Sequence, residues 1–183
     1  MKVVFLDRDG TLNDCPLDDY VKSAAGLRLY PYAVDSVRRM NEAGFEVIVI
    51  SNQAGVAKGI YTLKNLDEIT RRISLQMERA GASILDFFYC PHRDEDECLC
   101  RKPLPGLLKM AVRKYPSIDF QSSFLVGDSL KDMQLAAVGG LRSILVLTGH
   151  GENARLEAAQ LVPPPLAVVA NLAEAVSAIL KFA

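Results

Sequence analysis

The sequence lacks an excess of charge of either sign, and it lacks a long apolar segment at its start. Among 183 residues, 21 are Lys or Arg and 22 are Asp or Glu, which gives a formal net charge of -1. The basic residues are scattered, so we expect neither nucleic acid nor a membrane as a partner. The first apolar run, residues 3–6, meets Asp7 at once and is too short for a signal peptide or a membrane span. We expect a cytoplasmic monomer that acts on a small molecule.

Cysteine is also scarce, and its distribution does not suit a disulfide framework. Three of the four cysteines lie in residues 90–100, while Cys15 stands alone. This clustering suits a metal site in a reducing compartment. Three thiols and one imidazole form the ligand set of a closed tetrahedral zinc site, and they belong to Cys90, His92, Cys98 and Cys100. We therefore predict a structural Zn²⁺ that staples this loop and holds Arg101 and Lys102 in place.

The alternatives for these cysteines are a disulfide or buried free thiols. A bridge between Cys98 and Cys100 would be strained, and thiols in the polar run of residues 93–97 would hardly be buried. Recognition of nucleic acid by a zinc loop is a further alternative. The cluster lacks the basic and aromatic surroundings that such recognition needs.

Short apolar runs alternate with amphipathic segments along the chain. The runs that indicate buried strands are Val3 to Leu6, Phe45 to Ile50, Ile84 to Tyr89, Phe124 to Val126, Ile144 to Leu147 and Ala167 to Val169. Helices are predicted from Pro31 to Gly44, between Thr62 and Gly81, from Pro105, and from Ser129 to Val138. This alternation predicts an α/β, Rossmann-like three-layer sandwich with a mostly parallel sheet. We expect one domain over residues 1–183.

Polar residues follow three of the predicted strands. Asp7 ends the first, Ser51-Asn52-Gln53 the second, and Gly127-Asp128 the fourth. In parallel sheets, ligands bind at the carboxyl ends of the strands, where loops and helix N-termini converge. These three strand ends are therefore the predicted site.

The carboxylates of Asp7, Asp9 and Asp128 would repel one another unless a hard cation neutralised them. Magnesium is the expected cation, held by two carboxylates, a backbone carbonyl and a substrate phosphate oxygen. Asp7 is the predicted nucleophile, because attack by a carboxylate on phosphorus splits a difficult hydrolysis into two easier displacements. Asp9 is the predicted acid and base of these steps, and Gly10 permits a close approach of the backbone.

Two further residues suit supporting roles. Ser51 is expected to donate a hydrogen bond to a phosphoryl oxygen, and Lys102 to offset the negative charge there. These residues and Asp128 also have ordinary alternative roles. Ser51 and Asp128 could be helix caps, and Lys102 could be a solvated charge. Asp132 is predicted to be a surface acid or a neighbour of the metal site, and His150 a surface loop residue.

These motifs, in this order, resemble the haloacid dehalogenase (HAD) phosphatase superfamily. The matching stretches are Asp7-Arg8-Asp9-Gly10-Thr11-Leu12, Ser51-Asn52-Gln53, Arg101-Lys102-Pro103 and Gly127-Asp128. The resemblance implies Asp7 as nucleophile, Asp9 as acid and base, and Asp128 as a magnesium ligand. It implies phosphoryl contacts from Ser51 and Lys102. It also implies that the backbone carbonyl of Asp9 binds Mg²⁺.

The cysteine and histidine loop before Arg101, together with residues 51–59, resembles one branch of this superfamily, the heptose bisphosphate 7-phosphatases and related histidinol-phosphate phosphatases. By this likeness Asn52 and Gln53 line the phosphate or sugar, and Arg101 recognises the substrate. Members have no large cap domain, and residues 12–30 are too few to form one. The implied substrate is D-glycero-D-manno-heptose 1,7-bisphosphate, with histidinol phosphate as the alternative.

The sequence departs from the heptose enzymes in two places. The interval between His92 and Cys98 is shorter, and Ser129 stands where the branch often has lysine. Residues 14–20, which by analogy face the sugar, indicate no preference. An explanation of another class is a non-catalytic, receiver-like module that accepts phosphate as a signal. Such a module has no use for an acid-base group at Asp9.

Overall fold

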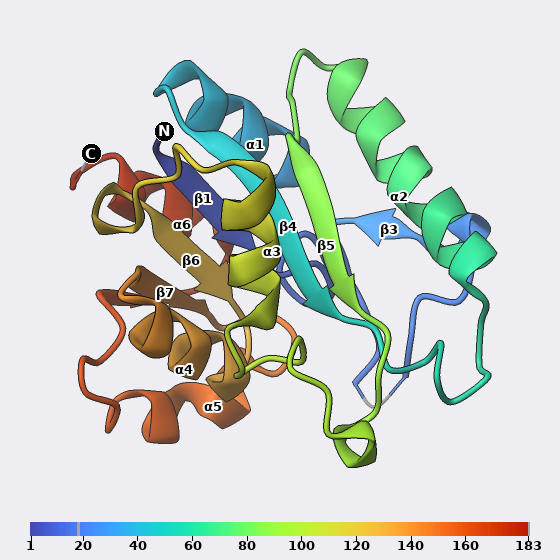
Figure 1. Cartoon of the computed structure of the whole chain (residues 1–183). Helices are drawn as coiled ribbons and strands as arrows, with labels where there is room; N and C mark the ends of the chain where they lie inside the picture. Colours follow the sequence, from blue (N-terminus) through green and yellow to red (C-terminus); the bar gives the residue numbers. More distant parts are fainter. Residues whose placement is uncertain (18, 183) are drawn as a thin grey trace.

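The computed structural model describes residues 1–17 and 19–182, and its centre is a six-stranded sheet (Figure 1). The strands are β1 (Val3–Leu6), β4 (Glu46–Asn52), β5 (Asp86–Cys90), β6 (Phe124–Gly127), β7 (Arg142–Val146) and β8 (Ala167–Val169). Their order is β5-β4-β1-β6-β7-β8, and every neighbouring pair is parallel. All six predicted strands are confirmed, with bounds that differ by a few residues at most.

Helices cover both faces of this sheet, as Figure 1 shows. One face packs against α1 (Ala33–Glu42), α2 (Leu63–Glu78) and α6 (Leu172–Ile179). The other packs against α3 (Gly106–Lys114), α4 (Leu130–Gly139) and α5 (Gly151–Ala158). In β1, Val4 and Leu6 enter the first core and Val3 and Phe5 the second, because successive strand residues point to opposite faces. The predicted three-layer α/β sandwich is confirmed.

The helix ends follow the predicted sequence signals. The side chain of Thr62 accepts a hydrogen bond from the backbone N–H of Asn65, and the side chain of Asn65 accepts one from the N–H of Thr62, so the two close a capping box at the start of α2. Ser129 caps α4 in the same way with Asp132. Gly140 ends α4 in the left-handed region with φ 67°, which glycine adopts without steric cost. The helices α5 and α6 were not predicted from the sequence.

The connection from β1 to α1 contains no large cap domain in its described residues. It holds a small antiparallel pair, β2 (Asn13–Asp14) and β3 (Arg28–Leu29), and a short 3₁₀ turn at Ala24–Gly26. Two-residue strands are too short to leave a periodic sequence signal, so this pair was not predicted. In the described part of the chain, no helix combines the length and the apolar character that crossing a membrane requires.

Candidate active site

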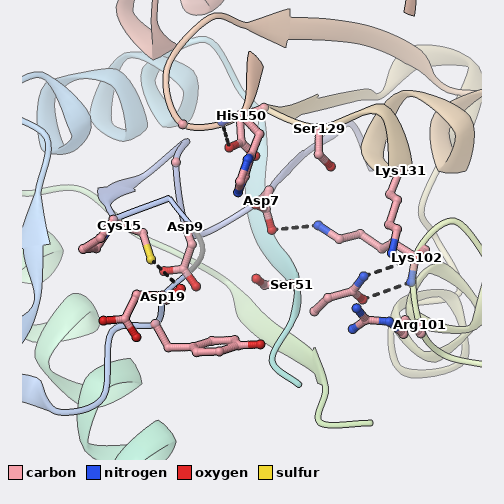
Figure 2. Close-up of a pocket in the computed structure, with 16 residues that line it drawn as sticks. Asp7, Asp9, Cys15, Asp19, Ser51, Arg101, Lys102, Ser129, Lys131 and His150 are labelled. Carbon is pink, nitrogen blue, oxygen red and sulfur yellow. Dashed lines mark hydrogen bonds and ion pairs between the residues drawn. The ribbon is translucent and has the colours of Figure 1, made fainter. Parts of the chain in front are cut away.

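A pocket opens where β4, β1 and β6 end, and these three strands are neighbours in the sheet (Figure 2). Its lining includes Asp7, Ser51 and Asp128, one residue from the end of each strand. Lys102 joins them from the loop before α3. The strand order thus brings together four predicted site residues that are up to 121 positions apart, counted as 128 minus 7.

Asp7 is fixed at the centre of this pocket. Its backbone N–H donates to the carbonyl of Val126 at 2.9 Å, and Oδ1 accepts from Lys102 Nζ at 2.7 Å. The residue is buried, and burial is the largest influence on its pKa, which is raised above the ordinary value although Lys102 acts in the opposite direction. The ion pair holds one carboxylate oxygen and leaves Oδ2 without a hydrogen-bond donor among the described residues.

Lys102 is a buried cation rather than a solvated one, because it lies only 3% exposed. Its Nζ donates to Asp7 Oδ1, to Asp132 Oδ1 at 2.5 Å and to the carbonyl of Ile50 at 3.1 Å, so all three ammonium hydrogens have acceptors. Asn52 holds the backbone of Lys102 from both sides: its Nδ2 donates to the carbonyl at 3.1 Å, and its Oδ1 accepts from the N–H at 3.0 Å. The end of β4 therefore fixes the position of the lysine.

Asp132 is fully buried, so the prediction of a surface acid is wrong and its alternative, a place beside the metal site, holds. Oδ1 accepts from Lys102, and Oδ2 accepts from the backbone N–H of Ser129 at 3.2 Å and from its hydroxyl at 2.5 Å. Both oxygens of Asp132 are engaged by protein groups. Asp132 lies in the first turn of α4, and its hydrogen bond from Lys102 Nζ helps to orient the lysine.

Asp128 is held by backbone groups of a tight turn. Its Oδ2 accepts from the N–H of His150 at 2.8 Å. Gly10 and Gly149 both have positive φ, and a Cβ on either would lie about 2 Å from Asp128 Oδ2, so only glycine fits at these positions. Burial, followed by the charges of Asp7 and Asp132, raises the pKa of Asp128 above its ordinary value. The side chain of His150 is exposed, as predicted, but it borders the pocket.

Asp9 borders the same pocket and is held by a cage of hydrogen-bond donors. Oδ1 accepts from Arg8 Nε at 3.0 Å and from Asn13 Nδ2 at 2.9 Å. Oδ2 accepts from Arg8 Nη2 at 2.8 Å and from Gln53 Nε2 at 2.9 Å. Burial alone would raise the pKa of Asp9, but the charge of Arg8 and these hydrogen bonds outweigh it and lower the pKa. The resting carboxylate is therefore ionised.

Gln53 does not line the pocket, so the structure does not support the prediction that it contacts phosphate or sugar. It is fully buried, and its amide is used within the protein. Nε2 donates to Asp9 and to Ser51 Oγ at 3.0 Å, while Oε1 accepts from Arg8 at 2.9 Å and from Tyr61 at 2.5 Å. The sequence alone shows that Gln53 follows a strand. It does not show whether the Gln53 side chain points into the pocket or into the protein interior.

Three carboxylates lie close enough to surround a cation. Oxygen atoms of Asp7, Asp128 and Asp132 lie within 4.8 Å of one another. Because both oxygens of Asp132 are taken, Asp7 and Asp128 are the two that fit a hard divalent ion. The raised pKa of each indicates a site in which a cation would stabilise the ionised form.

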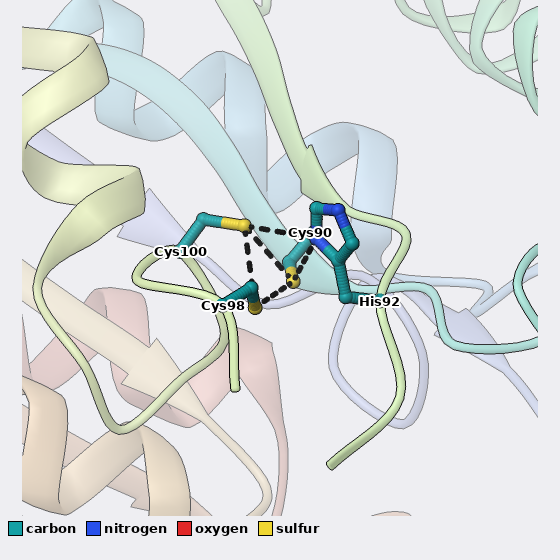
Figure 3. A group of neighbouring side chains, drawn as sticks. All are labelled: Cys90, His92, Cys98 and Cys100. Carbon is teal, nitrogen blue, oxygen red and sulfur yellow. Dashed lines mark hydrogen bonds between the residues drawn. The ribbon is translucent and has the colours of Figure 1, made fainter. Parts of the chain in front are cut away.

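The second group of side chains that could hold a metal ion lies at the end of β5 and in the loop after it (Figure 3). Sulfur atoms of Cys90, Cys98 and Cys100 lie 3.2 to 3.6 Å apart. His92 Nδ1 lies 3.3 Å from Cys100 Sγ and 3.6 Å from Cys90 Sγ. Tetrahedral Zn–S bonds of about 2.3 Å would place sulfur atoms about 3.8 Å apart, so the four donors fit one zinc ion. No disulfide joins any of the four cysteines, Cys15 included, so the structure gives no support to the disulfide alternative.

Cationic side chains line the pocket wall that faces this loop. Arg101 forms a bidentate ion pair with Asp94, with Nε–Oδ1 at 2.6 Å and Nη2–Oδ2 at 3.0 Å. Lys131 Nζ donates to the same Oδ1 at 3.2 Å. Both cations border the pocket, and Asp94 ties them to each other. Arg101 was predicted from the sequence to recognise the substrate. No sequence feature pointed to Lys131 of α4 as a pocket residue.

The opposite wall comes from the connection between β1 and α1, as predicted for residues 14–20. Cys15, Asp19 and Tyr20 line the pocket, whereas Asp18 lies outside the described residues. Tyr20 packs against Tyr61 with ring centroids 5.9 Å apart. The pocket thus has a basic wall, a mixed acidic and aromatic wall, and a floor of carboxylates.

A buried carboxylate paired with a buried lysine, at the carboxyl ends of a parallel three-layer sandwich, is the arrangement expected of a hydrolase of the HAD type. The sequence profile described as HAD-hydrolase-like matches residues 99–175. A D-glycero-β-D-manno-heptose-1,7-bisphosphate 7-phosphatase from Neisseria meningitidis is 38% identical over 154 residues, which cover 84% of this chain and 81% of that protein. The α-anomer enzyme of Photorhabdus laumondii is 37% identical over 82% of this chain and 85% of its own.

Solved structures agree with these relatives. The D,D-heptose 1,7-bisphosphate phosphatase of B. bronchiseptica, complexed with magnesium and phosphate, superposes with a TM-score of 0.92 at 33% identity and covers all of both chains. A putative HAD-like phosphatase from Mesorhizobium loti gives 0.82 at 27% identity and covers 99% of this chain and 87% of its own. The chain belongs to the D-glycero-D-manno-heptose-1,7-bisphosphate 7-phosphatase family of HAD hydrolases.

Proposed function

We propose that this protein is a magnesium-dependent phosphomonoester hydrolase whose substrate is D-glycero-D-manno-heptose 1,7-bisphosphate, from which it removes the 7-phosphate. The observation that carries the proposal is the ion pair between Asp7 Oδ1 and Lys102 Nζ at the bottom of the pocket. It presents a carboxylate nucleophile beside a cation that balances the charge of a phosphoryl group. Relatives with this name at 35 to 38% identity support the substrate.

The reaction has two displacements. In the first, an Asp7 oxygen forms a bond to phosphorus while the bond from phosphorus to the sugar oxygen breaks. Asp9, ionised at rest, must first take up a proton from solvent, and it then gives this proton to the sugar oxygen. In the second, water attacks the aspartyl phosphate, Asp9 takes a proton from the water, and Asp7 leaves as a carboxylate with inorganic phosphate. Ser51 and Lys102 would contact the phosphoryl oxygens in both steps.

Magnesium would be held by the carboxylates of Asp7 and Asp128 and by the backbone carbonyl of Asp9. The ion supplies charge neutralisation to the phosphoryl group and orients it for in-line attack. Two features of the site support this choice: the donors are oxygens, and the two carboxylates have raised pKa values that a cation would offset. The magnesium and phosphate bound by the B. bronchiseptica relative add to that support.

The other end of the substrate would meet the basic wall. Arg101 and Lys131 border the pocket on one side of Lys102, and both are oriented by Asp94. A pair of fixed cations is suited to a second phosphate group, which a bisphosphate has and histidinol phosphate lacks. Asn52 also borders the pocket, but its amide is committed to the backbone of Lys102, so we assign it a supporting role.

We propose that the cysteine and histidine cluster binds one structural Zn²⁺. Four protein donors leave no position for water, so the ion would staple the loop that leads into Arg101 and Lys102. Four cysteines without a disulfide among them suit a reducing compartment, which supports a cytoplasmic location. The balanced charge favours a small phosphorylated sugar as partner rather than nucleic acid or a membrane surface. We propose that the protein is a monomer.

The test is phosphate release from a panel of substrates in the presence of Mg²⁺. We expect kcat/KM for heptose 1,7-bisphosphate to exceed that for histidinol phosphate and nitrophenyl phosphate by about 10²-fold or more, because only the bisphosphate has a second phosphate group to pair with Arg101 and Lys131. Highest turnover of histidinol phosphate would overturn the heptose assignment. No turnover of any phosphomonoester would overturn the hydrolase and favour a receiver-like module.

A Lys131→Met variant sharpens the assignment of the second phosphate. We expect it to raise KM for the bisphosphate by about tenfold, the worth of one charged hydrogen bond, and to leave nitrophenyl phosphate hydrolysis unchanged. Lys109→Met, which removes an exposed lysine on α3 outside the pocket, is the matched control. An equal effect of Lys131→Met on both substrates would contradict a role in binding the second phosphate.

A further inference from the structure

Arg8 is the largest fully buried side chain of the described residues, and the reaction above assigns it no role. A buried guanidinium is costly unless charged and polar partners surround it. Its one ionised partner within the described chain is Asp9, the next residue. The Arg8 guanidinium also lies 5.8 Å from the ring centroid of Tyr89, and its Nη1 has no hydrogen-bond partner.

The pair between Arg8 and Asp9 is bidentate. Nε donates to Oδ1 at 3.0 Å and Nη2 donates to Oδ2 at 2.8 Å, so the planar guanidinium faces the planar carboxylate. This geometry fixes the orientation of the carboxylate as well as its charge. Gln53 Oε1 accepts a further hydrogen bond from Nη2 at 2.9 Å, and Tyr61 in turn holds Gln53.

The carboxylate of Asp9 has no acceptor position to spare in this arrangement. Each oxygen accepts two hydrogen bonds, one from Arg8 and one from an amide, that of Asn13 or of Gln53. A carboxylate offers about four lone-pair positions, and four donors occupy them. Proton exchange with a sugar oxygen or a water therefore requires one of the four donors to give way.

The side-chain amides of Gln53 and Asn13 can release Asp9 more easily than Arg8 can. Gln53 Nε2 also donates to Ser51 Oγ at 3.0 Å, and Asn13 Nδ2 also donates to the carbonyl of Asp14 at 2.9 Å. Each amide nitrogen thus keeps a partner after leaving Asp9. Arg8 would instead be left as a buried charge without an anion, which is strongly destabilising in proteins.

We propose that Arg8 is the positioning residue of the acid-base group: it anchors the Asp9 carboxylate through both half-reactions, while Gln53 and Asn13 yield their places to the reacting oxygens. The inference rests on the proposed function and deepens it. Arg8 touches neither substrate nor metal and acts through Asp9. The Asp9 side chain is 19% exposed toward the pocket, whereas that of Arg8 is 0% exposed.

The test compares two leaving groups with an Arg8→Met variant. A sugar alkoxide needs a proton to depart, whereas nitrophenolate does not, so only the sugar phosphate depends on Asp9 in the first displacement. We expect kcat for heptose bisphosphate to fall by about 10²-fold or more. Nitrophenyl phosphate should release a rapid burst of about one nitrophenolate per chain, followed by slow turnover, because only the second displacement then lacks its base.

A double-mutant cycle separates positioning from general structural damage. If Arg8 acts through Asp9, the Arg8→Met/Asp9→Asn double variant will be no slower than Asp9→Asn alone. Gln53→Met should lose less than tenfold, since the anchor remains. Arg142→Met is the matched control: this arginine stacks on Phe124 away from the pocket, and we expect the variant to keep wild-type kinetics.

Three results would overturn the inference. One is an Arg8→Met enzyme with wild-type kcat on both substrates. The second is an equal loss on both substrates without a burst. The third is an effect that multiplies with that of Asp9→Asn. If Arg8→Met does not fold, the same measurements are made on Arg8→Lys, which keeps the positive charge but cannot form the bidentate pair. We expect its kcat for heptose bisphosphate to lie between those of wild type and Asp9→Asn. A wild-type protein inactive on every phosphomonoester would instead contradict the proposed function itself.

Discussion

Lys102 Nζ donates hydrogen bonds to two buried carboxylates at once, to Asp7 at 2.7 Å and to Asp132 at 2.5 Å. The lysine is 95 positions from Asp7 in sequence and 30 from Asp132. One cation thus balances the proposed nucleophile and a helix residue that orients the cation itself. We therefore expect both folding and catalysis to depend on the charge of Lys102.

Replacement of Lys102 by Met is expected to damage both. The variant leaves two buried carboxylates without their cation, so we predict a free energy of unfolding lower by on the order of 3 kcal/mol, measured by urea denaturation at neutral pH. We also predict a loss in kcat of about 10²-fold or more, because charge stabilisation of the phosphoryl group is removed. Lys109→Met on the exposed side of α3 is the control. Retention of wild-type kcat by Lys102→Met would contradict its role.

Magnesium should stabilise the protein more as pH rises. The pKa values of Asp7 and Asp128 are raised by burial, so the folded state holds protons that the unfolded chain releases above about pH 4. Without a cation, these groups therefore lower stability as pH increases through that range. Mg²⁺ binds the ionised carboxylates and should offset the loss, so its effect on Tm will be larger near about pH 8 than near about pH 5.5.

Asp128→Asn provides the control for this measurement. The variant removes one proposed ligand and one of the two raised pKa values, so the increase of Tm with Mg²⁺ should shrink and depend less on pH. An equal effect of Mg²⁺ at both pH values in the wild-type protein would show that the ion binds elsewhere.

The zinc content of the purified protein should depend on the cysteines of the cluster and not on Cys15. We expect one zinc ion per purified chain by elemental analysis, loss of it in Cys98→Ser, and retention in Cys15→Ser, which alters the lone thiol outside the cluster. Because the loop leads into Arg101 and Lys102, Cys98→Ser should also lower Tm and raise KM for the bisphosphate. A Cys98→Ser protein with full zinc content would contradict the proposed ligand set.

The sequence predicted the sheet and the strand-end residues well, for a physical reason. Buried parallel strands appear as short apolar runs, and a polar residue directly after such a run, such as Asp7 or Asp128, marks the edge of the sheet where ligands bind. The cysteine and histidine cluster was also visible, because its four donors lie within residues 90–100. In both cases a local pattern carries the information.

The residues that were missed or misassigned depend on contacts between distant segments. Asp132 is buried where it accepts a hydrogen bond from Lys102, and Gln53 is buried where it contacts Arg8 and Tyr61. A local sequence pattern does not encode these contacts. One signal was available for Arg8: an arginine directly after a buried strand, between two acids, is expected to pair with one of them. Lys131 lies on an exposed helix turn and looks like any solvated lysine until Asp94 is seen beside it.

The most direct test of the account is chemical identification of the phosphorylated residue. Wild-type protein with Mg²⁺ and heptose bisphosphate is quenched in acid during turnover, digested and analysed by mass spectrometry. We predict one phosphoryl group on the peptide that contains Asp7, located on Asp7 itself, and none in Asp7→Asn, which should fold normally and be inactive. Phosphate on another residue, or turnover that survives in Asp7→Asn, would contradict the assignment of the nucleophile.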